Sequence, residues 1–275
     1  MIYCPYTDRE ISESEANREH IIPLSLGGLD GFEIPVCKNF NSKVGSKIDG
    51  ALANDFLILM KRNELDVRGH SNKKPKAVAK KSTDTSTGKP VQVAFDKYEG
   101  LKVWCPITKQ YLQGERTFQS SVSLDMDVGL KFVAKVALSA GYFVYGELFR
   151  NHVRHDEIRF IMNHDLRKSP SQAATISTRV DDRFKQDGNP DLEVFRILCG
   201  MLGNSSVVGL VPGPENIGIF VGVLGHYMGM LNVPANTESF PTEGEHDLGH
   251  VVCLQNGKIV RVSFRRAIEK LAEAL

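Results

Sequence analysis

The stretch "NREHIIPLSLGG" at residues 17–28 determines how the first part of the chain folds. It sets a carboxylate beside an imidazole at Glu19 and His20, and Pro23 and two glycines follow. Neighbouring residues in a strand point to opposite faces unless the strand ends or bulges there. Pro23 cannot donate a hydrogen bond to an adjacent strand, so it marks an edge or a strand end. The pattern therefore predicts that the pair lies where a strand gives way to a loop.

A second strand and a helix are expected directly after this loop. The segment "FEIPVC" at residues 32–37 is typical of a short strand or extended piece. Asn41 is a favourable helix N-cap, and apolar residues recur behind it at helical spacing. These apolar positions are Val44, Ile48, Leu52, Phe56 and Leu59. The predicted order is strand, loop, strand and then a helix that begins at Asn41.

This order and two motifs, "REHIIPLSLGG" and "VCKNFNSKVGSKID", resemble the HNH endonuclease family over about the first 60 residues. The resemblance implies a ββα-metal fold and metal-dependent hydrolysis of DNA phosphodiester bonds. It implies that His20 is the general base and that Glu19 is a metal ligand. Asn41 matches an asparagine that is a ligand in some members and an orienting residue in others. Asp49 matches an acidic residue common in this variety of the family.

The residues themselves suit that chemistry. Asn41 and Asp49 are eight positions apart, which is about 12 Å along a regular helix, so one ion cannot take both as direct ligands. We favour Asn41 as the ligand and treat Asp49 as a supporting residue. Oxygen ligands from Glu19 and an amide favour Mg²⁺ or Mn²⁺. A neutral His20 can accept a proton near neutral pH.

The expected module departs from the family at a structural zinc site. Many relatives hold zinc with two CxxC pairs, whereas here Thr7 and Phe40 stand where the second cysteines would be. Cys4 and Cys37 alone do not make a tetrahedral site. We predict that this zinc is absent and that Cys4, Cys37 and Phe40 pack as apolar residues.

Charge is unevenly distributed although the net charge is only +1. Residues 1–60 contain five basic and nine acidic side chains, whereas residues 61–90 contain nine basic and three acidic ones. An acidic module followed by a basic strip is compatible with a metal site beside a phosphate-binding surface, and a solvated linker is the alternative. The predicted nucleic-acid contacts are Arg18, Lys43, Lys47, Lys73, Lys74, Lys76, Lys80 and Lys81.

The whole chain of 275 residues is predicted to be α+β. We expect an HNH module over residues 1–62, a basic linker or loop over 63–95 and a mixed α+β domain over 96–275. Within that last domain, an apolar stripe predicts a helix over 128–149, and Asn256-Gly257 predicts a type I′ hairpin turn. The domain would choose the target or act as a sensor.

Two further histidine pairs have spacings that a metal ion could use. They are His152 with His155 and His246 with His250, the latter in "EHDLGH". The sequence gives no third ligand for either pair. We therefore interpret these histidines as surface or core residues.

Composition narrows the cellular setting. The five cysteines are odd in number and scattered, which excludes a disulfide framework and favours a reducing cytoplasm. We recognise no secretory signal and no apolar run long enough to span a membrane. DNA is the expected partner, and a homodimer is one way for a single-site fold to cut two strands.

Two alternatives to a constitutive nuclease stay open. The chain could be a non-catalytic nucleic-acid-binding protein that retains the fold. It could also be a nuclease gated by its C-terminal domain in a restriction or phage-defence system.

Overall fold

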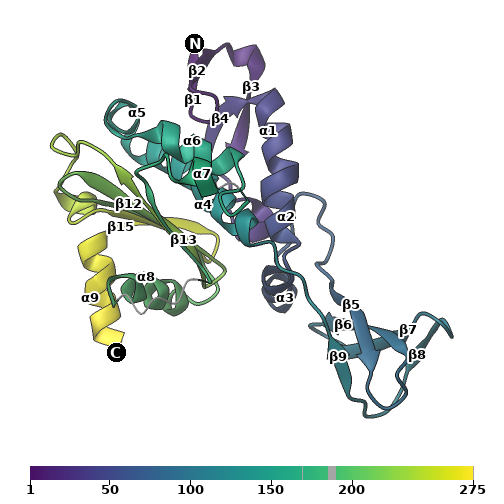
Figure 1. The fold of residues 1–275 in the computed structure, drawn as a ribbon. Helices are drawn as coiled ribbons and strands as arrows, with labels where there is room; N and C mark the ends of the chain where they lie inside the picture. Colours follow the sequence, from purple (N-terminus) through teal and green to yellow (C-terminus); the bar gives the residue numbers. More distant parts are fainter. Residues whose placement is uncertain (169, 185–189, 275) are drawn as a thin grey trace. The chain divides into compact units, whose positions relative to one another are not determined.

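The computed structural model describes residues 1–168, 170–184 and 190–274. The chain divides into two compact units. Unit 1 comprises residues 1–52 and 126–275, and unit 2 comprises residues 53–125. Unit 2 is thus an insertion in the sequence of unit 1. Figure 1 shows the elements of both units.

The N-terminal module of unit 1 contains two antiparallel strand pairs and a helix. Its strands are β1 (Ile2–Cys4), β2 (Arg9–Ile11), β3 (Ala16–His20) and β4 (Glu33–Cys37). Its helical segments are η1 (Glu13–Glu15), η2 (Leu24–Leu26), α1 (Lys38–Val44), the π-helical η3 (Gly45–Asp49) and α2 (Gly50–Ala53). β1 pairs with β2 and β3 pairs with β4. The predicted order of strand, loop, strand and helix is confirmed.

The loop between β3 and β4 is fixed by close backbone contacts. Ile21 and Ile22 are fully buried at its start. A Cβ atom on Gly28 would lie 1.7 Å from the carbonyl oxygen of Ile22, so only glycine fits there. Ser206 donates a hydrogen bond of 2.7 Å to the carbonyl oxygen of Leu26. The loop is therefore held both by its own backbone and by the C-terminal part of unit 1.

The prediction that the helix begins at Asn41 is wrong. Helix α1 begins at Lys38, directly after β4, and Cys37 is its N-cap without a side-chain capping bond. Asn41 is instead a buried residue inside the helix. Its side-chain amide donates a hydrogen bond to Asn17 on β3 and does not cap the helix. The chain passes from strand to helix with no polar cap to mark the boundary.

The C-terminal part of unit 1 is a six-stranded antiparallel sheet with helices on both faces. The strand order is β10-β13-β12-β11-β14-β15. The strands are β10 (Arg179–Asp182), β11 (Ser206–Pro212), β12 (Asn216–Val223), β13 (His226–Pro234), β14 (His250–Gln255) and β15 (Lys258–Ser263). The helices are α4 (Met126–Tyr145), α5 (Glu147–His152), α6 (His155–Asn163), α7 (Pro170–Ala173), α8 (Pro190–Met201), η4 (Gly244–His246) and α9 (Phe264–Ala274).

Two helical layers sandwich this sheet (Figure 1). On one face, the ring of Phe220 from β12 contacts Phe195 of α8 and Phe264 of α9. On the other face, α4 packs on β13, where a Cβ atom on Gly229 would contact Val133. Residues 217–223 of β12 are all buried because both faces are covered. The antiparallel sheet with helices on both faces confirms the predicted α+β class.

Helix α4 is the central helix of this core. By length and composition alone it could cross a membrane, and most of that stretch is buried inside the protein. The predicted helix over 128–149 corresponds to α4 and α5, which are separated at Gly146 with φ of +53°. The predicted hairpin is confirmed between β14 and β15, where Asn256 and Gly257 both have positive φ.

Unit 2 is a small antiparallel sheet with one helix. Its helix is α3 (Phe56–Leu65), and its strand order is β8-β7-β6-β5-β9. The strands are β5 (Ala77–Asp84), β6 (Pro90–Asp96), β7 (Gly100–Cys105), β8 (Gln110–Leu112) and β9 (Phe118–Ser120). Its core contains Ala79, Val91, Val93 and Val103, against which Phe56 and Phe95 pack.

The predicted linker over residues 63–95 is corrected by this sheet, because β5 and most of β6 lie within it. A β-bulge between Ala79 and Ser82 exposes both Lys80 and Lys81 and returns the next buried residue to the core face. The bulge breaks the period-two alternation, so the segment resembles a basic loop. The predicted boundaries at 62 and 96 are likewise replaced by boundaries near 52 and 125.

Candidate functional site

Strand β3 separates Glu19 from His20. Its ladder with β4 continues to the pair His20–Glu33, and the backbone of Ile21 still bonds to Phe32. Because the strand does not end before the pair, Glu19 points to one face and His20 to the other. The expectation that the pair marks the end of the strand holds for His20, which is the last residue of β3. The geometry does not bring the two side chains together.

His20 lies between two carboxylates. Its Nε2 atom is 2.9 Å from Asp30 Oδ1 and 3.0 Å from Glu33 Oε1. A carboxylate only accepts, so Nε2 carries a proton, and in the neutral ring the lone pair is then on Nδ1. The His20 side chain is 14% exposed, and Asp30 is 88% exposed. This arrangement orients the imidazole and leaves it in reach of solvent.

Glu19 lies on the opposite face, in a buried ionic cluster that the sequence analysis missed. Lys135 of α4 is fully buried, and its Nζ atom lies 2.5 Å from Glu19 Oε1 and 2.8 Å from Asp49 Oδ2. A third bond of 3.2 Å goes to the carbonyl oxygen of His20. All three ammonium protons are therefore used. The structure thus brings Asp49 next to Glu19 through a residue far along the chain.

Two carboxylates share this one buried ammonium. Burial raises the pKa of Asp49 to about 6, against the attraction of Lys135. Burial would lower the pKa of Lys135, but the charges of Asp49 and Glu19 outweigh it and raise that pKa. The lysine therefore stays protonated, and the two acids compete for its charge.

Asn41 approaches the same face of β3. It is 8% exposed, and its Nδ2 atom donates to Asn17 Oδ1 at 3.4 Å. Asn17 is two positions before Glu19, so both side chains are on the face of β3 that α1 covers. Asn41 Oδ1 is buried and has no hydrogen-bond partner within the described ranges 1–168, 170–184 and 190–274. An orphaned buried oxygen of this kind fits a bound cation or a water molecule.

The oxygen ligands needed for a hard divalent cation are thus present. Glu19 offers a carboxylate with two oxygens, of which Lys135 contacts one, and Asn41 offers its unpartnered oxygen. A second group, formed by His20, Asp30 and Glu33, has ligand atoms within 4.8 Å of one another. The group of His20, Asp30 and Glu33 therefore fits a divalent ion, while Glu19 and Asn41 offer oxygen ligands on the other face of β3.

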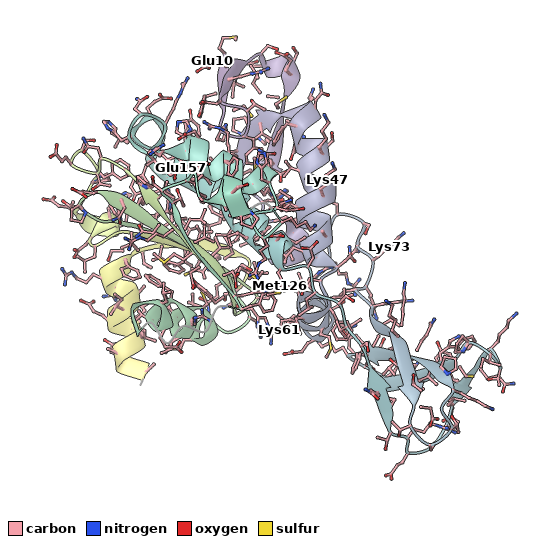
Figure 2. All side chains as sticks on the ribbon, viewed as in Figure 1. Glu10, Lys47, Lys61, Lys73, Met126 and Glu157 are labelled. Carbon is pink, nitrogen blue, oxygen red and sulfur yellow. The ribbon has the colours of Figure 1, made fainter. Side chains whose placement is uncertain are left out.

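The predicted phosphate contacts fall into two sets. In unit 1, Arg18 is 81% exposed at the side chain and lies 3.5 Å from Glu33. Lys43 and Lys47 are exposed and line a groove of roughly 260 Å³ together with Lys131. Figure 2 shows Lys47 on the module helix.

The second set lies in unit 2, where every one of the predicted lysines is exposed. These are Lys73, Lys74, Lys76, Lys80 and Lys81. The Nζ atom of Lys74 is 4.7 Å from the centre of the Tyr98 ring, and Lys80 and Lys81 follow one another in the bulge of β5. Lys80 and Lys81 are therefore on the folded sheet of unit 2, whereas Lys73, Lys74 and Lys76 lie in the loop before β5.

Cys4, Cys37 and Phe40, where relatives have zinc ligands, make close contacts within the module. The backbone N–H of Cys37 donates to Cys4 Sγ at 3.3 Å, and Cys4 is buried. The ring of Phe40 lies 6.0 Å from that of Tyr6, centre to centre. Cys4 and Phe40 are thus in packing contacts, and the absence of zinc stays a prediction.

Lys135, Asp30 and Glu33 are the residues that sequence reasoning missed. One signal was available for Lys135, which lies in the apolar run "KFVAKVALSA" at residues 131–140 and so needs an acidic partner when buried. Asp30 and Glu33 carried no such signal. They contact His20 only because the loop after β3 folds back, and this is visible only in the structure.

Comparison with known proteins bears on the N-terminal module. Residues 3–57 match the family model for HNH endonucleases. Comparisons with curated proteins and with solved structures found no match. The matched residues contain β1 to β4, the helix and both Glu19 and His20. The N-terminal module of this chain is therefore a member of the HNH endonuclease family.

Proposed function

We propose that the protein is a metal-dependent endonuclease that hydrolyses DNA phosphodiester bonds with His20 as general base. The family match over residues 3–57 supports nuclease activity. The observation that carries the catalytic assignment is the position of His20 at the end of β3, oriented by Asp30 and Glu33. Orientation by a carboxylate is how catalytic histidines are commonly held in one tautomer.

His20 would take the proton from the attacking water. With Nε2 bonded to carboxylates, the neutral ring has its lone pair on Nδ1. Asp30 and Glu33 would hold the ring in position while it takes the proton. The proton acceptor and the carboxylates that support it are all residues of the N-terminal module.

A divalent ion, Mg²⁺ or Mn²⁺, would be held by Glu19 and Asn41. When bound, it would stabilise the charge that develops on the phosphate and the leaving oxygen. Lys135 would keep its bond to one carboxylate oxygen of Glu19 and so fix the other. Asp49 would support this arrangement through the same lysine. If the ion is instead held by His20, Asp30 and Glu33, Glu19 is not a ligand and its substitution should leave the affinity for the ion unchanged.

Lys43 and Lys47 are proposed to contact the DNA backbone at the module. Cytoplasmic location, a role in restriction or phage defence and a homodimer are further proposals. A sensor role for the C-terminal sheet is favoured by one observation. Lys135, from its helix α4, directly contacts Glu19 of the module.

The test is cleavage of supercoiled plasmid with Mg²⁺, Mn²⁺ or EDTA. We expect His20→Ala to lose at least about 100-fold in rate, as expected for loss of a general base. His226→Ala is the matched control, because His226 is an exposed histidine of unit 1 outside the module. Cleavage by His20→Ala at the wild-type rate would refute the assignment. Intact plasmid with normal binding by the wild type would favour the non-catalytic alternative.

The same assay locates the ion. If Glu19 and Asn41 hold it, Glu19→Gln raises the Mg²⁺ concentration needed for half-maximal cleavage and Asp30→Asn does not. The reverse result would move the ion to the group of His20, Asp30 and Glu33.

A further inference from the structure

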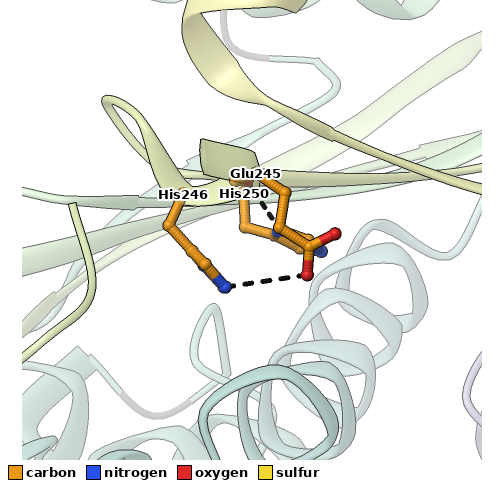
Figure 3. Close-up of side chains that lie close together, drawn as sticks. All are labelled: Glu245, His246 and His250. Atoms are coloured by element: carbon orange, nitrogen blue, oxygen red, sulfur yellow. Dashed lines mark hydrogen bonds and ion pairs between the residues drawn. The ribbon is translucent and has the colours of Figure 1, made fainter. Parts of the chain in front are cut away.

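Glu245, His246 and His250 form a cluster on the C-terminal sheet, outside the nuclease module (Figure 3). Glu245 and His246 are in η4, and His250 is the first residue of β14. Ligand atoms of the three side chains lie within 4.8 Å of one another. The fold therefore supplies a third potential ligand for the histidine pair that the sequence left without one.

The tautomer of His250 is fixed by a backbone bond. Its Nδ1 atom lies 2.8 Å from the carbonyl oxygen of Glu245, and a carbonyl only accepts, so Nδ1 carries the proton. The lone pair of the neutral ring is then on Nε2. The residue is 0% exposed, and Nε2 has no hydrogen-bond partner in the part of the chain that the structure describes. A buried acceptor left unpaired costs about 1–3 kcal/mol unless something binds it.

His246 faces the same carboxylate. Its Nε2 atom lies 3.7 Å from Glu245 Oε1, which is too long for a hydrogen bond. Two ligands on one tetrahedral zinc ion are separated by about 3.3 Å, given zinc–ligand bonds of about 2.0–2.1 Å. The rings of His246 and His250 stack with centres 4.7 Å apart. The pair is thus close to the spacing that a shared ion requires.

One charged neighbour of Glu245 lies close enough to compete with an ion. Arg261 is a competing partner for Glu245, with Nη1 3.9 Å from Oε1. The Glu245 side chain is 45% exposed, so it can turn from the arginine toward an ion.

We propose that Glu245, His246 and His250 bind one divalent transition-metal ion of the zinc type. The ligands would be a Glu245 carboxylate oxygen and the Nε2 atoms of the two histidines. Two imidazoles and one carboxylate are the ligands of zinc sites that keep a fourth position for water or a further ligand. The donation of the other ring N–H of His250 to a backbone carbonyl is the support that metal-binding histidines usually have. Mg²⁺ prefers oxygen ligands and does not suit this group.

The test measures Zn²⁺ binding to full-length protein that has been stripped with a chelator and dialysed. Competition with a chromogenic chelator gives affinity and stoichiometry, and Co²⁺ substitution gives a visible absorption band for a tetrahedral site. We expect one Zn²⁺ per chain. Glu245→Gln and His246→Ala should weaken binding at least about tenfold and abolish the band. The Glu245 side chain is 45% exposed, so Glu245→Gln should keep the wild-type circular dichroism spectrum, and the same spectrum checks the folding of His246→Ala.

Two controls separate this site from the nuclease module. His226→Ala removes an exposed histidine and should leave Zn²⁺ affinity unchanged. His20→Ala disrupts the group of His20, Asp30 and Glu33 in the module, and one Zn²⁺ should still bind. The proposal is overturned if the wild type binds no Zn²⁺, if Glu245→Gln and His246→Ala bind like the wild type, or if binding is lost with His20→Ala. In any of these cases His250 is a buried structural histidine.

Discussion

At the scale of single residues, Lys135 is one of the side chains that tie the nuclease module to the rest of unit 1. A charge buried this deeply is tolerated only when it is paired and fully hydrogen-bonded. Glu19, Asp49 and the backbone of His20 meet that condition. Glu19 and Asp49, which lie next to the proposed chemistry, are therefore held by a lysine from a helix much later in the chain.

We predict that Lys135→Met lowers the free energy of unfolding by about 3–5 kcal/mol, because it leaves two buried carboxylates without a counter-charge. Urea unfolding monitored by circular dichroism measures the effect. Lys131→Met is the matched control in the same helix. Its lysine is 21% exposed and pairs with Asp165, so we expect a loss of at most about 1 kcal/mol.

A second variant keeps this prediction open to contradiction. Adding Asp49→Asn to Lys135→Met removes one of the two unpaired charges and should restore part of the lost stability. Equal stability of Lys135→Met and the wild type would show that Glu19 and Asp49 are not held by the lysine.

At the scale of elements, the loop between β3 and β4 brings Asp30 and Glu33 to His20, the proposed general base. Gly28 allows the chain to turn back so that Asp30 and Glu33 reach His20. The module helix behind the loop contains a π-helical turn, η3, at the start of which a Cβ atom on Gly45 would meet no other atom within 4 Å. A side chain at Gly28 would therefore clash with the backbone, whereas a side chain at Gly45 would not.

We predict opposite outcomes for alanine at these glycines. Gly28→Ala should displace the loop, because its Cβ atom would lie 1.7 Å from the carbonyl oxygen of Ile22. We expect both lower stability, by more than about 1 kcal/mol, and slower plasmid cleavage. Gly45→Ala should be neutral or stabilise by up to about 1 kcal/mol, since alanine is the better helix former. Thermal unfolding and cleavage rates measure both. A Gly28→Ala protein indistinguishable from the wild type would contradict the role given to the loop.

The sequence predicted the ββα order and the hairpin at Asn256-Gly257, because each carries a local signal of turn chemistry and period. It misplaced the start of the module helix, since Asn41 has the residue type of a cap but its side chain is used by Asn17 on β3. It missed β5 because the bulge at Lys80 and Lys81 hides the alternation. Each error comes from a contact or irregularity that no local pattern encodes.

The candidate site divides in the same way. Glu19, His20 and Asn41 could be named from their motifs, whereas Asp30, Glu33 and Lys135 could not. The partners of His20 depend on loop geometry, and the partner of Glu19 depends on packing between distant segments. The residues of a motif can be predicted from the sequence. The residues that orient them or balance their charge can be identified only from the folded structure.

At the scale of the whole molecule, unit 2 interrupts unit 1 between the module helix and α4. It carries the five exposed lysines that the sequence analysis named, and two of them, Lys80 and Lys81, are presented together by a bulge on a folded sheet. Lysines on a rigid surface lose less conformational freedom on binding than lysines on a mobile linker. This favours a DNA-binding role for unit 2 over the role of a linker.

We predict that Lys80→Gln with Lys81→Gln weakens binding of duplex DNA regardless of its sequence. If each lysine contacts one phosphate, the slope of log affinity against log salt falls by about 1.8 in magnitude, because each contact contributes about 0.9. The matched control is Lys258→Gln with Lys270→Gln, which removes two exposed lysines from the C-terminal part of unit 1. Fluorescence anisotropy across a salt series measures both. If the two variants lose the same slope, net charge alone explains the effect. If neither loses any, unit 2 does not contact DNA through its bulge.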